Sequence, residues 1–399
     1  MKKELVMSLK NSCQKCLDDI VANKEAAGVN ILIRRNDEDL LYAQSGYADI
    51  STERKIERDT IFRMYSMSKP ITSAAVMILM QRGLIGLGEP VSRYLAGFRD
   101  QMIYDGTTPH TVVRPASIGD LMNMTSGLPY GNSSGNECEK RVQKVFDEVG
   151  RLLYTPDALG TVEIADRLGE AGVCFQPGSA WTYGTGADIL GAIVEVVSGK
   201  SFGEFLAEEL FGPLEMNDTD FWVPEDKRHR LASVYERRNG ELELFETDNL
   251  GIRYDAGVKP AFESGGAGMM STLDDYSKFA RMLLNRGTYK GRRILNEMAV
   301  RYMSTTILPP HQQDSFAKRQ ENLTGYSYGA LMRKAVHPEM ACHMTFEGEY
   351  GWDGWLGTFF ENIPSLNLSL VMGMQLSDPE GNFISEKVRN VVHPFLEYL

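Results

Sequence analysis

Strand-forming patterns occur near both ends of this chain, whereas the long stretch between them is mainly helical in period. Short β-rich runs lie at 29–33 and 40–43 and are joined through Asn36-Asp37, a good turn sequence. Further strands are predicted at about 326–334, 342–348, 354–361 and 367–375. The most economical arrangement pairs these segments in one antiparallel sheet built from both ends of the chain. The sequence therefore predicts an α+β fold with a helical insertion.

Helical periodicity predicts a helix at each end of the chain and several in its middle. Apolar residues recur at helical spacing over 4–24, and a closing helix is expected over 384–399. Interior helices are predicted at 71–82, 117–124, 137–153, 161–168, 186–198, 202–210 and 272–285. These elements divide the chain into a sheet domain, residues 1–85 and 265–399, and a mostly helical domain, residues 86–264. A cleft between two such domains is a natural place for a functional site.

The charge and the apolar runs of the chain argue against several kinds of partner. The 399 residues carry a formal net charge of -12, and no run of clustered Lys and Arg suits a nucleic-acid backbone. The longest apolar runs fall short of the roughly 18 residues that a membrane span requires. Five scattered cysteines fit reduced thiols better than a disulfide framework. These features predict a soluble, cytoplasmic protein that binds neither nucleic acid nor a membrane, and they leave its oligomeric state open.

Patterns that would indicate a metal site or a cofactor are weak. The six histidines include no H-x-x-x-H pair. Cys13 and Cys16 form a lone CxxC, with no second pair at metal-binding spacing, and are more simply one side of a helix. We therefore expect no metal and no cofactor.

Ser66 and Lys69 stand at the start of an apolar predicted helix. Their spacing of three places both side chains on one helical face, so that the amine can reach the hydroxyl. A serine needs a base to become a nucleophile, and desolvation lowers the pKa of a lysine from its usual value of about 10.4. Ser66-x-x-Lys69 therefore suggests nucleophilic catalysis. From these residues alone, a capping serine followed by a lysine whose amine reaches solvent is the alternative.

Four segments of the chain, in order, carry a resemblance to a known family. They are FRMYSMSKPITSAAVMILMQRGLIGLGEPVSRYL, LMNMTSGLPYG, QPGSAWTYGTGADILGAIVEVVSGKSFGEFLAEELFGPLEMNDTDF and GGAGMMSTLDDYSKFARMLL. The first resembles the nucleophile segment of the serine hydrolases that include class C β-lactamases, D,D-peptidases and family VIII carboxylesterases. The likeness extends over roughly residues 25–395. It implies a β-lactamase/transpeptidase-like fold, with Ser66 as the nucleophile that forms an acyl-enzyme.

The second catalytic element of that superfamily is a Tyr-x-Asn triplet, and the matching residues here are Tyr183, Gly184 and Thr185. The resemblance implies that Tyr183 works with Lys69 as general base and acid, while Thr185 stands at a substrate-binding position. Read from the residues themselves, Thr185 to Asp188 is a capping box that opens the helix over 186–198.

The third element is usually Lys-Thr-Gly or His-Thr-Gly, and this chain has Trp352-Asp353-Gly354 instead. Family VIII esterases commonly carry Trp-x-Gly, so the chain looks most like an esterase. Trp352, Asp353 and Gly354 are implied to border the substrate, with Gly354 allowing close approach of the strand. An indole in place of a cation, next to Asp353, should disfavour anionic substrates. By the same resemblance, the backbone N–H groups of Ser66 and Trp355 form the oxyanion hole.

Three other interpretations stay open or are set aside. A β-lactamase or D-amino-acid peptidase is the nearest enzymatic rival of an esterase that cleaves short-chain carboxylic esters. A catalytically silent binding protein of the same fold is the other. Ser133 lies in a G-x-S-x-G pattern at 131–135, but the strand and helix that such a nucleophile requires are not predicted around it. The expected substrate is a small-molecule ester or amide.

Overall fold

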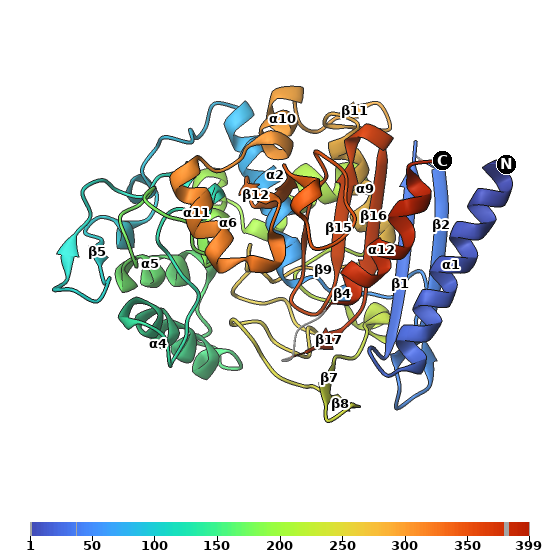
Figure 1. The fold of residues 1–399 in the computed structure, drawn as a ribbon. Coiled ribbons are helices and arrows are strands. Elements are labelled where there is room, and N and C mark those ends of the chain that lie inside the picture. Colours follow the sequence, from blue (N-terminus) through green and yellow to red (C-terminus); the bar gives the residue numbers. More distant parts are fainter. Residues whose placement is uncertain (1, 37, 379–382, 399) are drawn as a thin grey trace.

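The computed structural model describes residues 2–36, 38–378 and 383–398. Its largest sheet has eight antiparallel strands in the order β12-β13-β14-β15-β16-β1-β2-β3 (Figure 1). The strands are β1 Gly28–Arg35, β2 Glu38–Asp49, β3 Arg54–Lys55, β12 Tyr326–Gly329, β13 Met332–Ala335, β14 Tyr350–Asp353, β15 Phe359–Ile363 and β16 Leu368–Gly373. The two ends of the chain meet where β1 pairs with β16, in a register that sets Asn30 opposite Gly373. The predicted α+β fold is confirmed.

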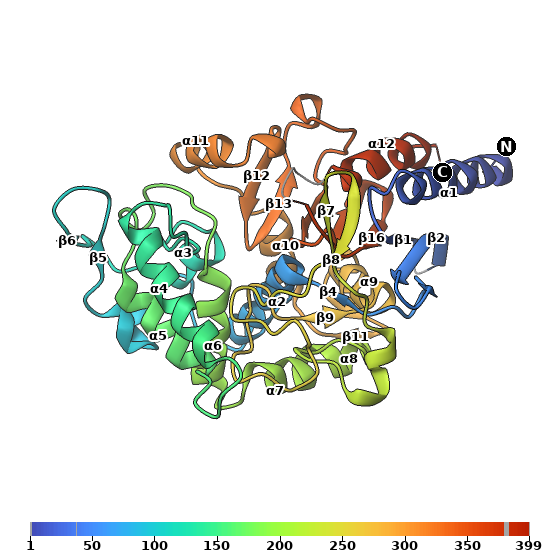
Figure 2. The same ribbon diagram turned by 90° about the horizontal axis from the view of Figure 1, so that it is seen from below.

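Helices cover both faces of this sheet (Figures 1 and 2). On one face α1 (Lys2–Ala22) packs beside α12 (Ile384–Leu396), and their apolar sides share one buried cluster with the sheet. On the other face lies α9 (Leu273–Leu284), whose Tyr276 ring packs against Phe360 of β15. The periodicity at the two ends of the chain thus predicts the two helices that cover this face of the sheet.

The middle of the chain forms a group of helices beside the sheet, far from α1 (Figure 2). They are α3 Ile118–Met122, α4 Glu137–Leu152, α5 Thr161–Ala171, α6 Gly186–Ser198, α7 Phe202–Leu206 and α8 Gly212–Leu214. Two further helices, α10 Glu297–Thr305 and α11 Pro310–Arg319, follow α9. The division into a sheet domain and a helical domain stays a prediction.

Short strands complete the fold. The pairs are β4 Phe62–Arg63 with β9 Met270–Ser271, β5 Met102–Ile103 with β6 His110–Thr111, and β10 Thr288–Tyr289 with β11 Arg292–Arg293. A three-stranded sheet contains β17 Leu376–Ser377, β7 Tyr235–Arg238 and β8 Glu241–Leu244. The pairing of β4 with β9 ties the segment before Ser66 to the Gly-rich segment before α9.

One helix joins the sheet to the helical group. α2 (Ser68–Gln81) contacts α6 on one side and β14 on the other, and nearly all of its side chains are buried. Its Ala, Met, Ile and Leu side chains explain both the helix and its burial, because they favour helix formation and have no polar group to satisfy. α2 is therefore packed between the sheet and the helical group.

Three predicted strands differ from the structure. The segment 326–334 is a hairpin and not one strand, because Ala330 and Leu331 both adopt positive φ and reverse the chain between β12 and β13. The segment 342–348 contains no strand. The strand expected at 354–361 begins only at Phe359, because residues 354–357 form a turn after β14. Among the described residues, none of the helices combines the length and apolarity needed to cross a membrane.

Candidate active site

Ser66 lies at a strained junction just before α2. It belongs to the 3-10 turn Tyr65–Met67, and Tyr65 has a φ of 42°, a value that costs energy for a residue with a bulky side chain. The Tyr65 ring is buried and meets the ring of Trp355 edge to face, at 5.0 Å between centroids. This contact holds the backbone in place, so that the Ser66 side chain stands at the start of α2 and stays partly exposed.

Lys69 is fully buried, and its amine has three polar neighbours. Nζ lies 3.0 Å from Ser66 Oγ, 3.0 Å from the Tyr130 hydroxyl and 2.8 Å from the Gly266 carbonyl oxygen. Burial lowers the pKa of Lys69 to about 7, although the carboxylates of Asp188 and Asp353 oppose this shift. A substantial fraction of the lysine is therefore neutral near pH 7, in contact with the hydroxyl that it would activate.

Tyr183 stands just before α6 and faces the same group. Its hydroxyl interacts with Ser66 and accepts a hydrogen bond from Trp352 Nε1 at 3.0 Å. Its ring centroid is 4.7 Å from Lys69 Nζ. Burial raises the pKa of Tyr183, against the effect of these two partners, so the hydroxyl keeps its proton at neutral pH and can pass it on.

Tyr130 is a member of this cluster that sequence reasoning missed. It comes from the loop between α3 and α4, and the 3.0 Å contact of its hydroxyl with Lys69 Nζ spans 61 residues of sequence. Burial raises the pKa of Tyr130 well above its usual value. The matched segment LMNMTSGLPYG ends one residue beyond it, so the signal was present, but no spacing rule connects this tyrosine to Ser66.

The predicted capping box at the start of α6 is wrong. Thr185 is the N-cap residue, but its side chain makes no cap hydrogen bond and its Oγ1 is buried without a partner among the described residues. Asp188 instead accepts hydrogen bonds from Ser264 Oγ at 2.5 Å and from the Gly266 N–H at 3.0 Å. The Asp188 carboxylate therefore fixes residues 264–266, and the Gly266 carbonyl oxygen in this segment contacts Lys69 Nζ.

Trp352 and Asp353 occupy the end of β14. The Trp352 indole N–H is used by Tyr183, so this side chain orients the tyrosine and has no second donor for substrate. The Asp353 side chain is 54% exposed and lies 3.4 Å from the buried guanidinium of Arg333. Because Arg333 compensates part of its charge, Asp353 repels an anionic substrate less than the sequence alone suggests.

Gly354 brings the turn after β14 against the nucleophile segment. A Cβ at this position would lie 2.3 Å from the Met64 carbonyl oxygen, so only glycine fits. The turn is closed by the Gly354 N–H bonded to the Thr358 carbonyl at 2.7 Å. In the described part of the chain, the N–H of the intervening Trp355 has no hydrogen-bond partner, as an oxyanion-hole donor requires.

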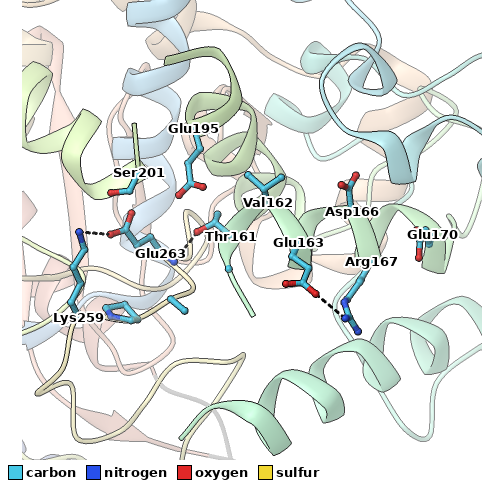
Figure 3. Close-up of a pocket in the computed structure, with 13 residues that line it drawn as sticks. Thr161, Val162, Glu163, Asp166, Arg167, Glu170, Glu195, Ser201, Lys259 and Glu263 are labelled. Carbon is cyan, nitrogen blue, oxygen red and sulfur yellow. Dashed lines mark hydrogen bonds and ion pairs between the residues drawn. The ribbon is translucent and has the colours of Figure 1, made fainter. Parts of the chain in front are cut away.

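Cavities lie beside this cluster and away from it. One of about 280 Å³ is bordered by Tyr130 and Tyr183, with Asn132 and Arg319 among its other lining residues. A larger one of about 840 Å³, between α5 and the segment around Glu263, is lined by none of the residues discussed above (Figure 3).

The structure also describes Ser133, the serine of the G-x-S-x-G pattern, which is exposed in a loop. Within the described ranges no group of three or more His, Cys, Asp or Glu side chains could hold a metal.

Comparisons with known proteins assign the chain to a family. The family described as Beta-lactamase matches residues 13–391. Protein Rv1367c of Mycobacterium tuberculosis is 30% identical over 88% of this chain and 86% of its own length. Esterase EstB of Burkholderia gladioli is 30% identical over 89% of this chain and 87% of its own length.

Solved structures show the same fold. EstCE1, described as a hydrolase with promiscuous acyltransferase activity, superimposes with a TM-score of 0.81 at 23% identity, covering 97% of this chain and 99% of that one. Simvastatin synthase (LovD) from Aspergillus terreus, in its unliganded selenomethionyl form, has a TM-score of 0.77 at 20% identity, covering 97% and 98%.

Proposed function

This chain belongs to the β-lactamase family and is a serine hydrolase, and we propose that it cleaves short-chain carboxylic esters through an acyl-enzyme on Ser66. The observation that carries the proposal is the fully buried Lys69 amine, 3.0 Å from Ser66 Oγ, with its pKa lowered to about 7. A base with a pKa near the working pH suits proton removal from a serine.

The proposed reaction has two halves. Lys69, with Tyr183, takes the proton of Ser66 while Oγ attacks the ester carbonyl, and the N–H groups of Ser66 and Trp355 stabilise the oxyanion. As the C–O bond breaks, Tyr183 passes a proton to the leaving alcohol. Water then gives up a proton to the same groups and attacks the acyl-enzyme, and Ser66 leaves with its proton restored.

The segment Trp352-Asp353-Gly354 favours an ester substrate over a β-lactam or a peptide. Trp352 supplies no cation for a substrate carboxylate, and its one N–H is already bonded to Tyr183. Thr185, Asp353 and Gly354 are proposed to border the substrate beside it. The esterase assignment of the Burkholderia relative points the same way.

A burst experiment with an activated chromogenic ester tests the proposal. The protein should release one equivalent of alcohol quickly, and intact-mass spectrometry should find the acyl group on the Ser66 peptide. Ser66→Ala should lose both signals, while Ser133→Ala, a matched change at an exposed serine, should keep them. A folded Ser66→Ala protein that still turns over ester would refute the nucleophile. A stable adduct with penicillin but none with esters would point to the β-lactamase or peptidase alternative, and no adduct with either would point to a binding protein.

A further inference from the structure

Two cysteines that are distant in sequence come together beside the loop of Tyr130. Cys138 is the second residue of α4 and is fully buried, whereas Cys174 follows α5 and is partly exposed. Cys138 Sγ lies 3.8 Å from the Gly172 carbonyl oxygen, and Cys174 Sγ lies 3.8 Å from Asn136 Oδ1. Each sulfur thus contacts a group two residues away from the other cysteine, and each thiol shifts the pKa of the other.

The surroundings distinguish the two thiols. The Cys138 thiol lowers the pKa of Cys174, assisted by Asn136 and the Arg319 guanidinium and opposed by burial and Glu139. The same interaction, together with burial, raises the pKa of Cys138. Cys174 is therefore the better nucleophile of the pair, and its partial exposure lets a small disulfide reach it.

Cys174 also interacts with both ends of the loop that carries Tyr130. Its N–H donates to the Gly127 carbonyl at 2.8 Å, which fixes the start of the loop. Its thiol meets Cys138, where the loop has just entered α4. Between these points lies Tyr130, whose hydroxyl contacts Lys69 Nζ. A covalent bond between Cys174 and Cys138 would fix the second end far more firmly than the hydrogen bond fixes the first.

We propose that Cys138 and Cys174 form a reversible intramolecular disulfide that closes the Tyr130 loop. The oxidant is a low-molecular-weight disulfide. Cys174 thiolate attacks one of its sulfurs and releases the first small thiolate, leaving a mixed disulfide on Cys174. Cys138 then loses its proton and attacks the Cys174 sulfur. The second small thiolate leaves and is protonated, so that two protein thiols are oxidised and one small disulfide is reduced to two thiols.

A disulfide between Cys138 and Cys174 differs from the reduced thiols that the scattered cysteines suggest. Spacing could not reveal the pair, because the contact is made by the packing of α4 against α5 and the segment after it. The other cysteines differ in setting. Cys13 and Cys16 are both buried on α1, and Cys342 is exposed.

The test treats the reduced full-length protein with oxidised glutathione and maps the products without reduction. We expect a loss of two hydrogens in the intact mass and a linked pair of Cys138 and Cys174 peptides. Cys138→Ser should stop at a glutathione adduct on Cys174, because the second thiol is missing. Cys174→Ser should give no linked pair, and Cys13→Ser, the matched control, should still form it. Free Cys138 and Cys174 at excess oxidant, or linkage of either to another cysteine, would overturn the proposal.

A second experiment measures the mobility of the Tyr130 loop. Amide hydrogen exchange over residues 128–137 should slow in the oxidised protein and return to its original rate after reduction with dithiothreitol. Unchanged exchange in a protein whose linkage has been mapped would overturn the closure of the loop. Both measurements are independent of ester cleavage, so they remain informative if the proposed activity is wrong.

Discussion

At the scale of single residues, the buried setting of Lys69 leads to a prediction about the variant Lys69→Arg. Lys69→Arg keeps a positive charge but cannot lose a proton in the useful range, so it removes the base. We expect the kcat/KM for a neutral ester to fall by about two to four powers of ten. Circular dichroism and thermal melting should show that the variant is folded. A folded Lys69→Arg protein with near-normal kcat/KM would contradict the assignment of Lys69 as base.

Asp188 raises the pKa of that base, against the larger effect of burial. The groups that face Lys69 Nζ are the Ser66 and Tyr130 hydroxyls, the Gly266 carbonyl and the Tyr183 ring. The charges of Asp188 and Asp353 act on it as well. The Asp188 carboxylate stabilises the ammonium form, so Asp188→Asn should lower the pKa of Lys69 further. Activity that requires neutral lysine is lost as pH falls below that pKa, and its acidic limb should therefore shift to lower pH.

The measurement is kcat/KM of Asp188→Asn across the neutral pH range. Asp120→Asn is the matched control, since Asp120 is also a buried carboxylate but is paired with Arg114 at the start of α3. The control should leave the acidic limb in place even if it lowers stability. An unshifted limb in Asp188→Asn, or a shift to higher pH, would remove Asp188 from this role.

Residues separated by a fixed spacing were predictable, and residues joined only by folding were not. Ser66 and Lys69 are one helical turn apart, and Tyr183 follows from the matched triplet. Tyr130 and the Gly266 carbonyl reach Lys69 from other parts of the chain, which no local pattern encodes. Thr185 to Asp188 had the spacing of a capping box, but Ser264 and Gly266 compete successfully for the carboxylate.

At the scale of elements, the N-caps of α4 and α6 can be compared by their contribution to the free energy of unfolding. α4 has a complete capping box from Asn136 and Glu139, whereas α6 has no side-chain cap. Asn136→Ala should lower the free energy of unfolding by about 0.5–2 kcal/mol. Thr185→Val removes a buried hydroxyl that has no partner among the described residues, so it should leave this free energy unchanged or raise it. Urea denaturation measures both, and a loss in Thr185→Val equal to that in Asn136→Ala would restore the capping box.

Helices were predicted more closely than strands because their period extends over more residues. The helix predicted at 186–198 has the bounds observed for α6. The hairpin of β12 and β13 escaped prediction because Ala330 and Leu331 take positive φ without the Gly or Asn that usually marks such a turn. α10 and α11 were missed altogether, since both are short and α11 has few apolar positions.

At the scale of the whole molecule, the two ends of the chain share one core. Leu17 of α1 is fully buried in the cluster that contains Ile31 of β1 and Val388 of α12. Leu17→Ala should lower the free energy of unfolding by about 2–5 kcal/mol, because it leaves a cavity where both ends meet. Met7→Ala on the same helix is the control, since Met7 is 57% exposed. Equal melting temperatures for the two variants would show that α1 does not support the sheet.

The pairing of β1 with β16 also determines the order of events as the chain is synthesised. The hairpin of β1 and β2 leaves the ribosome long before the strand that covers its other edge is made, since Asn30 faces Gly373. Until then β1 presents an open row of amide and carbonyl groups beside apolar side chains, a template for the nascent chains of neighbouring ribosomes. Yield from rapid overexpression should therefore depend on translation rate and on chaperones that shield this edge, and the sheet should be completed only after β16 has been made.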